Sequence, residues 1–168
     1  TKCLEHLRKS YRQYAWPGLK LRRLPSEAPT LGKLRAHAHR PVPQSLRSGK
    51  TFLCMTRFVP MKRVDLLLKS MMTVLEECPS TKLVLCGNGE GRESLKELPD
   101  RLELNNSAII TGYVTGGEKW AYLQHADVFA LPSNGEGFGI SYLEAAACGK
   151  PAIAAEEGGA PEAVLHEK

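Results

Sequence analysis

DVFALPSNGEGFGISYLEAAACGKPAIAA, residues 127–155, is the part of this 168-residue chain that most clearly indicates how it folds. Two apolar runs of strand length, Asp127–Leu131 and Pro151–Ala155, flank a segment from Gly139 to Cys148 that favours a helix. Gly149 follows at once, at the position where a glycine commonly ends a helix. This order of strand, glycine-rich loop, helix and strand predicts a βαβ unit with parallel strands.

The same alternation continues toward the N-terminal side and to the end of the chain. Apolar runs predict three more strands, at Thr51–Thr56, Lys82–Cys86 and Ala108–Thr111. Helices are expected between them and at the C-terminal end, at residues 62–78, 91–104, 117–125 and 160–165. Continuous apolar strands separated by helices are typical of a parallel sheet covered on both faces. The sequence therefore predicts an α/β fold with a doubly wound, Rossmann-like parallel sheet over residues 51–168.

Residues 1–50 have a different composition from the rest of the chain. They hold 12 Lys and Arg against two Glu, whereas the remainder holds 11 basic and 16 acidic residues. Five prolines lie between Pro17 and Pro43, which is typical of a linker or extended arm. We expect a basic, poorly ordered segment with at most one short helix. Contact with acidic lipid headgroups, contact with nucleic acid and a solvated linker all stay open for it.

The five cysteines contain no C-x-x-C pair, and Cys54, Cys86 and Cys148 lie among apolar or small residues. This pattern favours reduced structural thiols, as in a cytosolic protein. No window approaches the length of a membrane span. We expect a cytoplasmic protein, located at the cytosolic face of a membrane if the basic segment binds lipid headgroups.

Doubly wound sheets bind ligands beyond the C-terminal ends of their strands, where the loops meet. The first such loop contains two cations, Arg57 and Lys62, and the loop after the fourth strand contains Glu136. Gly139 opens the next helix, whose free N–H groups and partial positive charge favour an anion. Cations beside a helix N-terminus suit a diphosphate.

Glu136 and Glu144 flank this helix N-terminus, one just before the helix and one within it. Each carboxylate offers two acceptor oxygens, which suit the hydroxyls of a sugar ring. A ligand with a hydroxylated ring on each side of a diphosphate fits this arrangement. A nucleotide sugar is such a molecule.

The spacing Glu136-x7-Glu144 resembles the signature of the retaining glycosyltransferases of the GT-B fold, in particular the group 1, or family 4, transferases. Further segments resemble this family in the same order along the chain: TRFVPMKRVDLLLKS (56–70), KLVLCGNGEG (82–91), IITGYV (109–114), YLQHADVFALPSNGEGFGISYLEAAACGKPAIA (122–154) and GGAPEAV (158–164). The resemblance covers about 70% of the chain, residues 51–168. It implies the C-terminal, donor-binding half of such an enzyme, truncated at both ends.

The resemblance also implies roles for individual residues. Arg57 and Lys62 would neutralise the donor's diphosphate, Glu136 would hold the transferred sugar and Glu144 the ribose. Backbone and side chains of seven further residues would contact sugar, phosphate or base: Gly87, Gly112, Tyr113, Val114, Phe138, Gly139 and Ile140. The implied reaction transfers a hexose from a UDP- or GDP-sugar to a hydroxyl of a lipid carrier, glycan or small molecule, without metal or other cofactor. The acceptor domain is missing, so we expect this part alone to be inactive.

The sequence departs from the family pattern at two positions. Thr56 stands where a Gly usually precedes Arg57, and Arg63 stands where a Gly is common after Lys62. Two other classes of function also bind such ligands. A non-catalytic sugar-nucleotide-binding or interaction module stays open. A dinucleotide-binding oxidoreductase is disfavoured, because Arg92 occupies the third glycine position of a G-x-G-x-x-G motif begun at Gly87.

Overall fold

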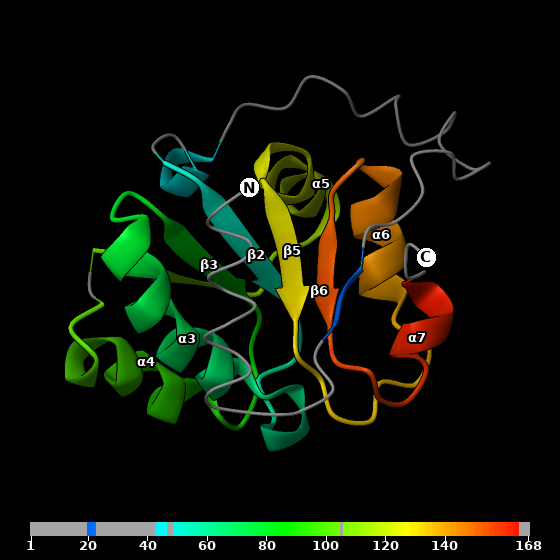
Figure 1. The fold of residues 1–168 in the computed structure, drawn as a ribbon, viewed down its shortest axis with the longest axis horizontal. Coiled ribbons are helices and arrows are strands. Elements are labelled where there is room, and N and C mark those ends of the chain that lie inside the picture. The colour runs from blue at the N-terminus through cyan, green and yellow to red at the C-terminus, as the bar shows by residue number, and fades with distance from the viewer. Residues whose placement is uncertain (1–19, 23–42, 47–48, 105, 165–168) are drawn as a thin grey trace.

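A computed structural model of the chain describes residues 20–22, 43–46, 49–104 and 106–164, which form a six-stranded sheet with flanking helices (Figure 1). The strands lie side by side in the order β1 (Lys20–Arg22), β6 (Ala152–Ala154), β5 (Val128–Leu131), β2 (Thr51–Met55), β3 (Lys82–Cys86) and β4 (Ala108–Gly112). The strands from β2 to β6 are mutually parallel, and β1 pairs with β6 in the antiparallel direction. The predicted doubly wound parallel sheet is thereby confirmed.

The helices form two groups. α3 (Val64–Glu77) packs against α4 (Arg92–Arg101), whereas α5 (Gly116–His125) packs against α6 (Ile140–Ala147), which also contacts α7 (Ala160–Ala163). Strand order moves from β2 toward β4 in one direction and from β5 toward β6 in the other. Because parallel crossovers are right-handed, this reversal places the two groups on opposite faces of the sheet. The reversal between β2 and β5 is the switch point where such folds bind ligands.

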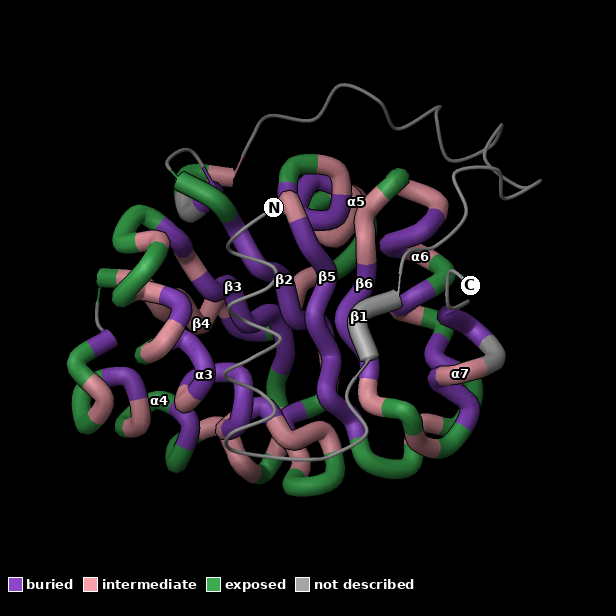
Figure 2. Tube along the Cα trace, viewed as in Figure 1, coloured by how far each residue is buried: buried purple, intermediate pink, exposed green. Residues whose placement is uncertain are grey.

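The sheet supplies most of the core. Figure 2 shows the central strands as a buried layer, and every residue of β2, β5 and β6 is buried. β4, at the edge, is mostly half-buried. α3 buries one stripe against the sheet, which includes Leu67, Leu68 and Met71. Burial on both faces explains why the central strands are continuous apolar runs.

The structure differs from the predicted elements at three places, the first of which is that α4 ends at Arg101 and not at residue 104. The helix predicted from Lys62 begins at Val64, because Pro60–Lys62 form a 3-10 turn (η3) and Arg63 takes a left-handed conformation with φ 51°. The segment before residue 51, predicted to hold at most a short helix, contributes β1 and the 3-10 turn η2 (Gln44–Leu46). A strand held by backbone pairing at a sheet edge needs no apolar pattern, so KLR gave no strand signal. The short helix predicted near the N-terminus lies outside the described residues.

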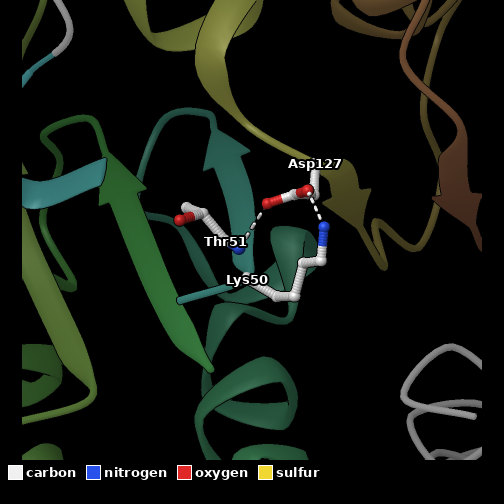
Figure 3. Close-up of polar contacts among 3 residues, drawn as sticks. All are labelled: Lys50, Thr51 and Asp127. Atoms are coloured by element: carbon white, nitrogen blue, oxygen red, sulfur yellow. Dashed lines mark hydrogen bonds and ion pairs between the residues drawn. The ribbon is translucent and has the colours of Figure 1, made fainter. Parts of the chain in front are cut away.

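Asp127 joins the beginnings of two central strands, as Figure 3 shows. Its Oδ2 accepts a hydrogen bond from the Thr51 backbone N–H at 2.9 Å, and its Oδ1 accepts one from Lys50 Nζ at 2.9 Å. Thr51 is buried, so the carboxylate satisfies a donor that water cannot reach. This contact fixes β2 against β5 at their N-terminal ends.

Cys54, Cys86 and Cys148 are free thiols, as the sequence predicts, but Cys78 is disulfide-bonded, so the expectation of reduced cysteines is wrong at that position. Of the helices that the structure describes, none is both long and apolar enough to cross a membrane.

Candidate functional site

An open cleft of about 870 Å³ lies at the C-terminal edge of the parallel strands. The loops that follow β2, β3 and β4 line it, together with the first turns of α5 and α6. Its lining residues are Met55, Thr56, Arg57, Cys86, Gly87, Asn88, Gly89, Tyr113, Val114, Thr115, Gly116, Lys119 and Ser141. The cleft therefore occupies the sheet edge at which the sequence predicts the ligand site.

Close backbone packing requires a glycine at position 87. A Cβ atom there would lie 1.9 Å from the backbone oxygen of Thr56. The Gly87 N–H also donates a hydrogen bond to the backbone oxygen of Gly112, at 2.8 Å. Gly87 thus holds the three loops after β2, β3 and β4 together, and this close contact shapes the floor of the cleft.

The loop that carries Glu136 is held from two sides. The Asn134 N–H donates to the backbone oxygen of Met61 at 2.7 Å, and the Gly159 N–H donates to that of Glu136 at 2.6 Å. A Cβ atom on Gly159 would lie 2.1 Å from the backbone oxygen of Gly137. The glycine pair after β6 therefore lets its own loop pack directly on the Glu136 loop.

This support brings Lys62 and Glu136 together. Lys62 Nζ donates to Glu136 Oε2 at 2.6 Å, and both side chains are 16% exposed. One side chain comes from the turn after β2 and the other from the loop after β5. A cation and a carboxylate that the sequence assigns to one ligand site are therefore in direct contact.

A second lysine contacts the other glutamate of the motif. Lys119, in the first turns of α5, donates a hydrogen bond to Glu144 Oε1 in α6. Its Nζ also lies 5.7 Å from the centre of the Trp120 ring, within the range of a cation–π contact. Lys119 lines the cleft and Glu144 does not, so the pair places Glu144 next to a lining residue of the cleft.

The N-terminus of α6 is fixed by a tyrosine beneath it. Gly139 caps the helix with φ 75°, and a Cβ atom there would lie 2.5 Å from the Tyr142 ring. The Tyr142 hydroxyl donates to the backbone oxygen of Leu131 at 2.5 Å. Burial raises the pKa of this hydroxyl, so it stays protonated as the donor. The free N–H groups of α6 are held in place beside the Glu136 loop.

Of the eleven predicted site residues, four line the cleft, and Lys62, Glu136 and Glu144 are not among its lining residues. Arg57, Gly87, Tyr113 and Val114 line the cleft, and Gly112 ends β4 directly beside it. Phe138, Gly139 and Ile140 are not lining residues of this cleft: they form the start of α6, where Phe138 and Ile140 are 55% and 64% exposed. The roles assigned to all these residues stay predictions.

Sequence reasoning missed some of the cleft. Thr115, Gly116, Lys119 and Ser141 line it but were not singled out. Thr115 and Gly116 directly follow the predicted Gly112–Val114 loop and could have been included on that ground. Lys119 gave no signal, because its contact depends on how α5 and α6 pack.

The two departures from the family pattern have different consequences. Arg63 has the left-handed φ of 51° that glycine adopts readily, so the arginine follows the backbone path that glycine favours there. Thr56 lines the cleft, and its backbone oxygen is the atom that excludes a side chain at Gly87. Within residues 20–22, 43–46, 49–104 and 106–164, no three His, Cys, Asp or Glu residues are grouped to hold a metal ion. The expectation that no metal is needed stays a prediction.

Comparisons with known proteins agree with this geometry. Residues 37–168 match the family of glycosyl transferases group 1. The chain is 37% identical over 123 residues to a GDP-mannose-dependent alpha-(1-6)-phosphatidylinositol monomannoside mannosyltransferase of Mycolicibacterium smegmatis, with 69% of this chain and 32% of that protein covered. It is 37% identical over 105 residues to the alpha-monoglucosyldiacylglycerol synthase of Streptococcus pneumoniae, with 62% of this chain and 24% of that protein covered.

The fold is similar to that of Anabaena HepE, solved in complex with UDP-glucose, at a TM-score of 0.65 and 27% identity. That likeness covers 83% of this chain and 37% of the HepE chain. The chain spans about a third of the length of the first curated relatives that it matches. The match to the family covers most of the chain, and the chain therefore belongs to the group 1 glycosyl transferases.

Proposed function

We propose that this chain is the donor-binding part of a retaining glycosyltransferase that transfers a hexose from a nucleoside diphosphate sugar to an acceptor hydroxyl. The observation that carries the proposal is the contact between Lys62 and Glu136 beside the N-terminus of α6. Relatives named as users of GDP-mannose, and a similar fold solved with UDP-glucose, support a nucleotide sugar as the ligand.

In this proposal the diphosphate binds between Arg57, Lys62 and the free N–H groups of α6. The N–H groups of α6 are held in place by the helix before the ligand arrives, whereas Lys62 must first exchange its contact with Glu136 for one with the diphosphate. Once they contact the diphosphate, the cations and the N–H groups stabilise the negative charge that grows as it departs. The proposed chemistry uses no metal.

The two glutamates bind the rings on either side of the diphosphate. Glu136 accepts hydrogen bonds from hydroxyls of the transferred sugar, and Glu144 accepts them from the ribose. The base lies against the loop of Tyr113 and Val114. The acceptor and its binding site belong to the rest of the protein.

The test is a transfer assay on the full-length protein that contains this chain. It is incubated with UDP-glucose or GDP-mannose, and release of the nucleoside diphosphate is followed with and without EDTA. We expect release from one of the two donors, unaffected by EDTA and abolished in Glu136→Ala. Donor binding without any release, even with lipid and sugar acceptors added, would favour a binding module instead.

A further inference from the structure

Lys119 is a charged cleft residue to which neither the sequence motifs nor the proposed diphosphate site gives a role. It lines the cleft, and its ammonium contacts Glu144, the residue proposed to bind ribose. We propose that Lys119 is a positioning residue that holds the Glu144 carboxylate toward the ribose hydroxyls, so that discrimination between ribose and 2′-deoxyribose donors depends on it. This inference rests on the proposed function.

The geometry defines how the pair is built. Lys119 and Glu144 are 25 residues apart and come from two helices that pack against each other, α5 and α6. The side chains are 31% and 20% exposed, and of the two only Lys119 lines the cleft. The Trp120 ring lies 5.7 Å from the same ammonium. Lys119 is therefore held between an aromatic ring and the carboxylate that it orients.

The pair leaves Glu144 able to bind a ligand. The lysine bonds to Oε1, and among the described residues no side chain donates to Oε2. A carboxylate accepts about four hydrogen bonds, so one contact with lysine leaves acceptor positions for two neighbouring hydroxyls. The arrangement thus orients the glutamate without occupying it fully.

Orientation matters because a glutamate side chain has several rotatable bonds. A free glutamate at a helix start samples several rotamers, and binding would have to restrict them. A glutamate that is already held pays less of that entropic cost when the ribose arrives. Only ligands with both ribose hydroxyls gain the full effect, because a 2′-deoxyribose lacks one of the two hydroxyls that donate hydrogen bonds to the carboxylate.

The experiment measures nucleotide binding by calorimetry on the full-length protein. The probes are UDP, GDP and their 2′-deoxy forms, used without any sugar so that the Glu136 end of the site has no ligand. The variants are Lys119→Met, which removes the charge but keeps a long unbranched side chain, and Lys119→Arg, which keeps a cation. Lys96→Met is the matched control, because Lys96 pairs with Glu93 at 2.9 Å on the exposed surface of α4. Thermal unfolding of each variant shows that it is folded.

The wild type should bind one ribonucleotide about tenfold more tightly than its 2′-deoxy form. This is the effect expected for the loss of one hydrogen bond to a charged group. Lys119→Met should bring this ratio close to one by weakening ribonucleotide binding, while Lys119→Arg and Lys96→Met keep it. An unchanged ratio in Lys119→Met would overturn the inference, and so would tighter ribonucleotide binding, since the lysine would then block Glu144. Absence of a ribose preference in the wild type would also overturn it. Failure of the wild type to bind any of the four nucleotides would contradict the proposed function itself.

Discussion

Lys62 Nζ lies 2.6 Å from Glu136 Oε2. The lysine and the glutamate, which are proposed to bind different parts of the donor, therefore contact each other when no donor is present. Both side chains are only 16% exposed, and each is largely shielded from water. In the ligand-free protein each neutralises the other's charge. In the proposed function donor binding must replace this pair, because the lysine would then contact the diphosphate and the carboxylate the sugar hydroxyls.

Substitution of Lys62 should therefore affect both turnover and stability. We expect Lys62→Met to lower turnover of the full-length protein about a hundredfold, which corresponds to about 3 kcal/mol of lost transition-state stabilisation. It should also destabilise the fold by about 1–2 kcal/mol, because Glu136 keeps a largely buried charge without its partner. Steady-state kinetics and urea unfolding measure the two effects.

The double variant Lys62→Met/Glu136→Gln separates them. It should recover part of the stability, because no unpaired charge remains, yet stay as inactive as the single variant. Lys69→Met is the control, since Lys69 pairs with Asp65 at 3.0 Å with both side chains more than 40% exposed. It should change stability by less than about 1 kcal/mol. Full turnover in Lys62→Met would contradict the proposed role.

The glycine pair after β6 leads to a second prediction. Gly159→Ala places a Cβ atom 2.1 Å from the backbone oxygen of Gly137, so the two loops must separate. We expect a loss of about 2–3 kcal/mol in unfolding free energy, together with loss of nucleotide-sugar binding, because the Glu136 loop loses its support. Gly137→Ala is the matched control for stability, since a Cβ atom there meets nothing within 4 Å. Equal stability of the two variants would show that the loops do not pack as described.

The central sheet could be predicted from the sequence because burial on both faces leaves an unbroken apolar run, as in LVLC of β3 and VFAL of β5. The edge at which the loops meet follows from strand direction alone, so the placement of Arg57, Gly87 and Tyr113 could also be predicted. Short helices and turns follow less directly from the sequence. The 3-10 turn before Val64 depends on the left-handed conformation of Arg63. An arginine does not by itself indicate a left-handed conformation.

Contacts between side chains of distant elements could not be predicted. The Lys119–Glu144 pair joins residues 25 positions apart, and neither the helical period nor the motif spacing brings them together. The pair of Lys62 and Glu136, 74 positions apart, could be assigned to one site but not to one another. In both cases the contact depends on how two loops or helices pack against each other. No local sequence pattern specifies that packing.

Asp127 provides a test of the fold away from the site. Asp127→Ala leaves the buried Thr51 N–H without its acceptor, and we expect a loss of about 1–3 kcal/mol in unfolding free energy. Lys50→Ala removes only the other contact of the same carboxylate, and the Lys50 side chain is 68% exposed. That variant should cost much less stability than Asp127→Ala, because an exposed ion pair contributes little. Urea unfolding of the two variants should therefore separate them clearly, and equal losses would count against the role of Asp127 in joining β2 to β5.

Glu103 supports a prediction of increased stability. It follows α4 with φ 57°, a left-handed conformation that costs any residue with a Cβ atom about 1 kcal/mol. Glu103→Gly should therefore raise the unfolding free energy by about 0.5–1 kcal/mol. The same substitution inside the helix, at the exposed Glu97, should lower it by about 1 kcal/mol. Thermal unfolding measures both, and a loss of stability in Glu103→Gly would contradict the conformation described for that residue.

The thiol of Cys86, at the floor of the cleft, should make stability depend on alkaline pH. Burial raises the pKa of Cys86 to about 12, while a hydrogen bond with Thr111 acts in the opposite direction. Because the pKa is raised in the folded protein, its contribution to stability is complete below the ordinary thiol value of about 8.5 and is lost as the pH rises toward 12.

Two measurements check this. At pH 8 iodoacetamide should modify Cys86 about a thousandfold more slowly in the native protein than in the urea-unfolded chain, because so little thiolate is present. The unfolding free energy should decline between about pH 8.5 and pH 10.5, and Cys86→Ala should reduce that decline. Cys54 is also buried with a raised pKa, so part of the decline should persist in the variant and become smaller again when both thiols are replaced. An identical pH profile in Cys86→Ala and the wild type would show that this thiol is not buried in the folded protein.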